Sequence, residues 1–92
     1  MPSIFKIGSY LVFFWSGDTD EPIHVHVAQG KPSENATKIW LTAAGGCIVS
    51  HNKSRIPEQE LNDILKIISD QFFYICNLWK SYFETDTIKF YC

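Results

Sequence analysis

Two histidines separated by one residue are the side chains of this sequence with the clearest capacity for chemistry. Residues 23–28 alternate in character, so that His24 and His26 are interleaved with Val25 and Val27. Successive side chains of a β-strand point to opposite faces, and the alternation therefore predicts a strand that presents both imidazoles on one face. Imidazole acts as an acid, a base or a metal ligand near neutral pH.

A second alternating segment, residues 36–42, places Ile39 and Leu41 opposite Lys38 and Trp40. If helical structure covers one face of the sheet, the apolar side chains should turn toward it. We expect the opposite, open face to carry His24, His26, Lys38 and Trp40 together. Lysine can hold a phosphate and an exposed tryptophan offers a stacking surface, so this face would suit RNA or a nucleotide.

The polar connector that follows, residues 50–55, contains His51, Lys53 and Arg55 just before an expected helix start. Cationic side chains beside free backbone N–H groups at a helix N-terminus favour anion binding. One hypothesis is therefore a metal-independent ribonuclease. In it, His24 and His26 act as acid and base with Lys38 or Arg55 on the phosphate, and Trp40, Lys53 and His51 bind the substrate.

A His-x-His pair can also donate two imidazoles to one metal ion, but a zinc site needs at least three protein ligands. The third would have to come from Asp18, Asp20, Glu21 or His51, and the spacing does not choose among them. We therefore assign no metal ligands and expect no cofactor. In the structural alternative, the histidines hydrogen-bond to the acidic loop 18–21 or pack at a partner interface.

The elements that must position these residues are read from the apolar pattern. Strands are expected at 4–7 and 10–15, joined by a tight turn at Gly8-Ser9, then after Pro22, at 36–42 and, more briefly, at 47–49. Apolar residues recur every three or four positions from 57 to 83, which predicts one long helix. The tail, 84–92, adds a short edge strand at 88–91 or trails off. The fold class is α+β: an antiparallel sheet of four to five short strands (about 4–50) on one long C-terminal helix (about 57–83), forming a single domain, 1–92.

Such a helix would be about 40 Å long, whereas a globule of this size is about 32 Å across. Its apolar surface is also broad, because Ile67, Phe73, Tyr74 and Leu78 lie outside the main stripe. Either a partner or second subunit covers the excess, or the tail folds back over it.

Composition limits the classes of function and the cellular location that remain possible. A formal net charge of −2 is not the strongly basic footprint of a nucleic-acid binder, so any RNA contact would use a local patch. The apolar run at residues 10–15 is far shorter than a membrane span, and the N-terminal residues lack a signal-peptide pattern. Three cysteines without a C-x-x-C pair predict neither a disulfide framework nor a thiolate zinc site. We expect a cytoplasmic protein without membrane contact.

Several segments are similar to one known family. They are Met1–Phe5, the aromatic residues 13–16, Glu-Pro-Ile-His-Val-His-Val at 21–27, Ala-Thr-Lys-Ile-Trp-Leu at 36–41 and Trp-Lys-Ser-Tyr-Phe at 79–83. Together they resemble the small bacterial family catalogued as domain of unknown function 4160. The connector 51–55 is more polar and basic than that family's pattern, so no family role is carried onto it.

The resemblance implies a partner rather than an activity, since members of this family often look like one half of a two-gene toxin-antitoxin module. It would make this chain the toxin-like component and His24 and His26 the first residues to test. Our leading hypothesis is thus an interaction module that binds a cognate small protein, or a second copy of itself, through the long helix. The ribonuclease and a metal-binding domain are the alternatives.

Overall fold

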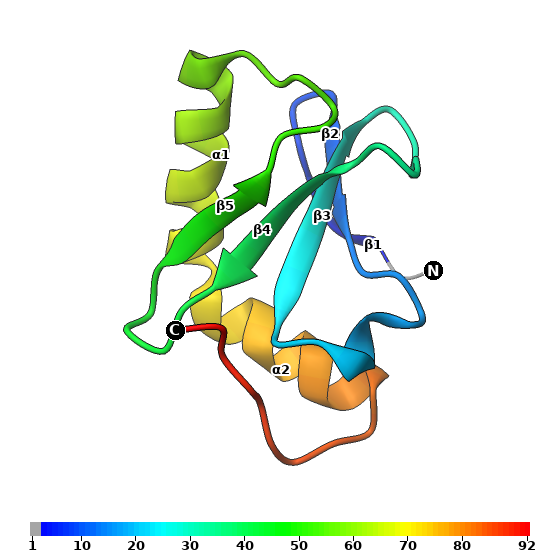
Figure 1. Ribbon diagram of the computed structural model, residues 1–92, viewed down its shortest axis with the longest axis vertical. Helices are drawn as coiled ribbons and strands as arrows, with labels where there is room; N and C mark the ends of the chain where they lie inside the picture. Colours follow the sequence, from blue (N-terminus) through cyan, green and yellow to red (C-terminus); the bar gives the residue numbers. More distant parts are fainter. Residues whose placement is uncertain (1–2) are drawn as a thin grey trace.

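The first half of the chain forms short strands because β-branched and aromatic runs alternate with glycine- and proline-containing turns. In the computed structural model, which describes residues 3–92, they are β1 (Ser3–Ile7), β2 (Tyr10–Phe13), β3 (His24–Gln29), β4 (Thr37–Leu41) and β5 (Cys47–His51). Each strand pairs with the next in antiparallel fashion, so the sheet is a meander with β3 at its centre (Figure 1). The α+β class and the antiparallel sheet are confirmed.

The turns differ in length, and this difference shapes the sheet. Gly8 has a φ of 59°, a left-handed conformation that glycine adopts without a Cβ clash, and it closes the tight turn between β1 and β2 as expected. The connection from β2 to β3 is much longer and contains a short 3-10 helix, η1 (Asp18–Asp20). This longer loop has enough chain to return toward the sheet.

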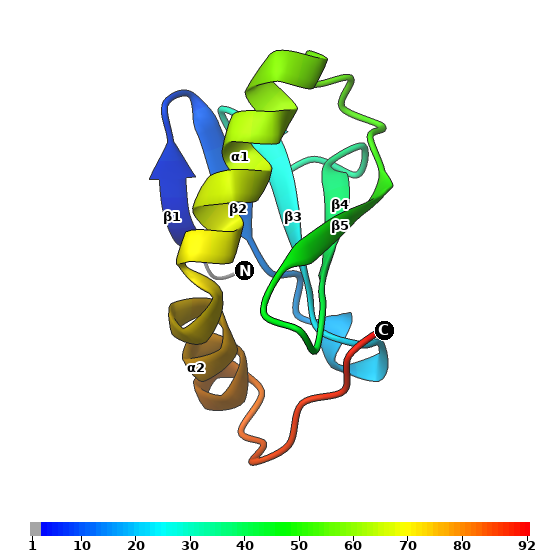
Figure 2. The same ribbon diagram turned by 90° about the vertical axis from the view of Figure 1, so that its left-hand side faces the viewer.

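The expectation of one long helix was wrong. The helical segment is divided at Gln71 into α1 (Glu58–Asp70) and α2 (Phe72–Tyr82). A continuous helix over residues 57–83 would be about 40 Å long, while the molecule measures 34 Å along its longest axis. The break lets α2 change direction and pass across the end of the sheet, beside the start of β3 (Figures 1 and 2).

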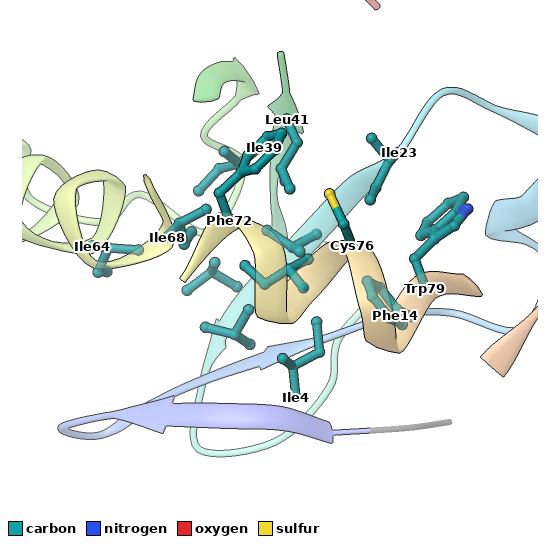
Figure 3. Close-up of a cluster of buried hydrophobic side chains, with 14 of the residues drawn as sticks. Ile4, Phe14, Ile23, Ile39, Leu41, Ile64, Ile68, Phe72, Cys76 and Trp79 are labelled. Atoms are coloured by element: carbon teal, nitrogen blue, oxygen red, sulfur yellow. The ribbon is translucent and has the colours of Figure 1, made fainter. Parts of the chain in front are cut away.

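The main core lies between the sheet and the two helices (Figure 3). Val25, Val27, Ile39 and Leu41 are fully buried there, on the helix-facing side of the sheet, as the alternation predicted. Both helices contribute to the same core, with Ile64 and Ile68 from α1 and Phe72, Ile75, Cys76 and Trp79 from α2. A smaller apolar cluster elsewhere in the fold consists of Leu11, Phe13, Ala28 and Ala36, with Trp15 packed against it.

The tail forms no strand at 88–91 but is held against the ends of the strands by backbone hydrogen bonds. The Ile23 N–H donates to the Lys89 carbonyl (2.8 Å), and the Ala43 N–H donates to the Cys92 carbonyl (2.9 Å). Phe90 packs against the core and stacks on Phe72 with the ring centres 6.0 Å apart. The tail therefore covers part of the helical apolar surface. No helix in the described part of the chain is both long and apolar enough to span a membrane.

This packing predicts a large difference between two apolar residues of α2. Ile75 is fully buried, whereas Phe73 is 79% exposed. Replacing Ile75 with alanine should lower the free energy of unfolding by about 2–4 kcal/mol, because it leaves a cavity in the core. The Phe73→Ala control should change it by less than about 0.5 kcal/mol. Urea denaturation followed by circular dichroism measures both, and equal losses would contradict this placement of α2.

Candidate functional site

The two histidines share a face of β3, but that face is closed over them. His24 is 1% exposed and His26 is 9% exposed. They are opposite Trp40 and Lys38 of β4, respectively, so all four side chains lie on one side of the sheet as predicted. The expectation that the histidines lie on an open surface was wrong, because aromatic rings and the loop after β2 surround them.

The loop after β2 carries an acidic side chain into this buried region. Its short helix, η1, is fixed by backbone hydrogen bonds from Asp18 to Trp15 (3.1 Å) and from Glu21 to Asp18 (3.1 Å). The Asp18 carboxylate accepts a further hydrogen bond from the Trp15 N–H at Oδ2 (2.7 Å), and the residue is only 6% exposed. The carboxylate is thereby held in one position beneath the loop.

Both imidazoles approach this carboxylate through Nε2. His26 Nε2 lies 3.2 Å from Oδ1 and 3.1 Å from Oδ2 of Asp18, within hydrogen-bond geometry. His24 Nε2 lies 3.0 Å from Oδ1, yet this buried atom has no aligned hydrogen-bond partner. On the other side of the His24 ring, Nδ1 donates to the Pro22 carbonyl at 2.8 Å. These three residues form what we call the His-Asp cluster.

The charge state of the cluster is set by competing effects on Asp18. Burial acts to raise the pKa of the carboxyl, but the contacts with His24 and His26, followed by the Trp15 amide, lower that pKa well below its usual range. Asp18 is therefore ionised at neutral pH. The histidines therefore contact the acidic loop, as the structural alternative from the sequence described.

Lys38 and Trp40 are engaged with other side chains instead of being free for a ligand. Lys38 forms an ion pair with Glu21, and its ammonium lies 4.3 Å from the centre of the Trp40 ring. The Lys38 charge lowers the pKa of the Glu21 carboxyl, which partial burial opposes. The Tyr91 ring stacks on Trp40 with the centres 4.9 Å apart and the planes at 6°. Trp40 is accordingly only partly exposed.

The remaining predicted residues are divided between this face and the opposite end of the sheet. His51 is the last residue of β5 and is paired with Lys38, and burial, then nearby lysines, lower its pKa. Lys53 and Arg55 are exposed in the connector that leads to α1. Figure 1 shows that connector at the end of the sheet away from η1 and α2. The structure therefore brings His24, His26, Lys38, Trp40 and His51 onto one sheet face, whereas Lys53 and Arg55 belong to the connector at the other end of the sheet.

One residue of the cluster was not selected from the sequence. Among residues 3–92, Asp18, His24 and His26 are the group of three potential metal ligands whose donor atoms lie within 4.8 Å of one another. The acidic loop indicated Asp18 only as one of four candidates for a third ligand. The choice depends on how the loop turns at Trp15, which no spacing in the sequence specifies.

The family description agrees with the sequence resemblance. A family model described as "Domain of unknown function (DUF4160)" matches residues 9–80. The chain belongs to this family. The matched DUF4160 region contains β2, η1, β3 and β4, and so includes every residue of the His-Asp cluster. No curated protein and no solved structure matches the chain.

The ionised Asp18 predicts a specific dependence of stability on pH. Because its pKa is lowered in the folded state, its contribution is present above the pKa of an unfolded aspartate, about 3.9, and is lost as the pH falls below that value. Asp18→Asn should be less stable than wild type by about 2 kcal/mol at pH 7. It should also lose less stability than wild type between pH 5 and pH 3.

Urea denaturation at pH 7, 5 and 3, in the presence of a chelator, measures this difference. Asp20→Asn is the matched control, because Asp20 belongs to the same short helix but is exposed. It should follow the wild-type profile. If the Asp18→Asn and wild-type profiles are parallel, the described charge state of the cluster is incorrect.

Proposed function

We propose that this chain is a partner-binding, toxin-like component of a two-gene module, and that it holds a cognate small protein on the outer face of α2. The observation that carries the proposal is the exposed aromatic surface of that helix. Phe73 is 79% exposed, Tyr74 is 49% exposed and Tyr82 is 39% exposed. Large exposed aromatic side chains are typical of interaction sites.

The tail does not remove this surface. Phe90 stacks on Phe72, on the side of α2 that faces the core, while the neighbouring Phe73 ring remains in solvent. Between the helix and the tail lies a hollow of about 300 Å³, lined by Phe72, Phe73, Cys76, Asn77, Lys80, Asp86, Ile88 and Phe90. An apolar floor with Lys80 and Asp86 among its polar lining residues suits a protein segment that inserts one large apolar side chain.

The ribonuclease alternative receives less support from the geometry. A general acid or base must come within hydrogen-bond reach of the substrate, and His24 and His26 are buried against Asp18. Of the two residues expected to hold the phosphate, Lys38 is opposite His26 but is paired with Glu21. Arg55 belongs to the connector between β5 and α1, which Figure 1 shows at the other end of the sheet. The module proposal instead uses surface that is accessible in the folded chain.

Substitution on α2 tests the proposed interface. Phe73→Asp should weaken binding to the product of an adjacent small gene by at least about 30-fold, since it places a charge where an aromatic anchor would be buried. Ile48→Asp is the matched control, because Ile48 is also a large exposed apolar residue, 41% exposed, but lies on β5. Co-purification and titration calorimetry measure both. Equal binding of the partner by both variants would contradict a cognate protein at this site. So would the finding that the chain forms a homodimer, and no heterocomplex, and that Phe73→Asp disrupts this homodimer.

Induced expression in a bacterial host separates the module from the enzyme. We expect wild-type expression to arrest growth while total RNA stays intact, and co-expression of the partner to relieve the arrest. RNA breakdown that is abolished by the double variant His24→Ala/His26→Ala would favour the ribonuclease and contradict the proposal. If neither the wild type nor the double variant impairs growth when expressed alone, the toxin-like role is contradicted.

A further inference from the structure

We propose that the His-Asp cluster is a binding site for one divalent transition-metal ion of the zinc type, with His24 Nε2, His26 Nε2 and an Asp18 carboxylate oxygen as its ligands. The site goes beyond the partner-binding role proposed above, and it uses residues on the sheet, not the outer face of α2. Imidazole nitrogen selects borderline ions such as Zn²⁺, Co²⁺ or Fe²⁺ over Mg²⁺ and Ca²⁺.

The contacts of the His24 ring supply the first argument. Nδ1 lies 2.8 Å from the Pro22 carbonyl oxygen, which can only accept a hydrogen bond, so Nδ1 carries a proton. In a neutral ring, Nε2 then has a bare lone pair 3.0 Å from the Asp18 oxygen, in a residue that is 1% exposed. Two electron-rich atoms at this distance repel each other unless a positive charge joins them. That charge is either a second proton on His24 or a metal ion.

The contact between His24 Nε2 and the Asp18 carboxylate suits a metal ion as well as a proton. A proton on Nε2 would be expected to point at the carboxylate, because a buried charged donor without an aligned acceptor is unfavourable. Instead, His24 Nε2 is buried without an aligned partner, although Asp18 Oδ1 is only 3.0 Å away. A hydrogen bond needs the nitrogen, the proton and the oxygen to be nearly in line, whereas coordination to a metal ion has no such requirement. It requires only that each lone pair be directed at one common point.

The spacing of the donor atoms fits a metal ion. Metal–ligand bonds of about 2.1 Å at tetrahedral or octahedral angles place adjacent ligand atoms about 3.0–3.4 Å apart. The distances from the two Nε2 atoms to the Asp18 oxygens are 3.0, 3.1 and 3.2 Å. All the ligand atoms of the three residues, the two Nε2 atoms included, lie within 4.8 Å of one another, so side-chain adjustment can bring them around one ion.

The outer contacts of the cluster are those that metal sites use to orient their ligands. A metal-bound histidine usually donates its second ring N–H to a carbonyl or carboxylate, and a ligating carboxylate is itself hydrogen-bonded. His24 donates Nδ1–H to Pro22, and Asp18 Oδ2 accepts from the Trp15 N–H. β3 is paired on both sides, so it holds the two imidazoles on a rigid support.

Three protein ligands leave at least one coordination position for another group. A small polar pocket of about 160 Å³ is lined by neighbours of the cluster residues and by the tail: Thr19, Glu21, Trp79, Thr85, Thr87 and Lys89. Thr19 follows Asp18 in the chain, and the Trp79 ring centre is 5.8 Å from that of His24. The fourth position would be filled by water or by a small polar ligand.

Titration of metal-free protein with Zn²⁺ and Co²⁺ tests the proposal. We expect one ion per chain, release of about one proton on binding, a visible Co²⁺ spectrum without a thiolate charge-transfer band, and a higher melting temperature. His24→Gln, His26→Gln and Asp18→Asn should each weaken binding by at least about 100-fold, a larger effect than loss of an outer contact. His51→Gln is the matched control, since His51 lies on the same sheet face outside the cluster, and it should bind as wild type does.

A measurement on the wild-type protein keeps the test valid if a variant fails to fold. In nitrogen-15 NMR spectra of the histidine side chains, Zn²⁺ should shift the Nε2 resonances of His24 and His26 and leave those of His51 unchanged. Absence of binding at micromolar protein and metal, shifts at His51 alone, or a thiolate band from cysteine ligation would each overturn the proposal.

Discussion

Burial of two imidazoles on the central strand is the constraint on which much of the surrounding structure depends. β3 has a neighbour on each side, and every residue from His24 to Ala28 is buried. The two valines meet the helices as apolar residues do, but the two histidines bring polar nitrogens into a buried region. Buried polar atoms need partners. The β2–β3 loop supplies one by directing the Asp18 carboxylate toward the sheet, and Pro22 supplies another.

The division of the helical segment follows from a second constraint, the size of the sheet. Five strands of four to six residues present too short a surface for one straight helix of this length. The break at Gln71 allows α1 to pack along the sheet and α2 to cross its end, where Trp79 reaches the His24 ring. The direction of α2 thus leaves Phe73 exposed and places Trp79 beside the His-Asp cluster.

The C-terminal tail, residues 84–92, connects the sheet with α2. Its backbone pairs with Ile23, the residue before β3, while its side chains Phe90 and Tyr91 stack on Phe72 and Trp40. The tail therefore closes the end of the main core and also covers part of the sheet face that was expected to be open. A partner bound on α2 would contact a helix that packs directly against the cluster and the tail, which gives the two proposed sites a physical connection through Trp79.

The amino-acid sequence by itself determined the class of fold, the approximate positions of the strands, the hairpin that opens the chain, the faces on which the alternating residues of β3 and β4 lie, and the family. These properties depend on local periodicity and turn residues, which are visible in the order of amino acids. Only the tertiary structure decided that the helix breaks at Gln71, that the histidine face is closed and that Asp18 is the acid beside the imidazoles. Those outcomes depend on the dimensions of the sheet and on the paths of a loop and a tail, which bring together residues that no short-range pattern relates.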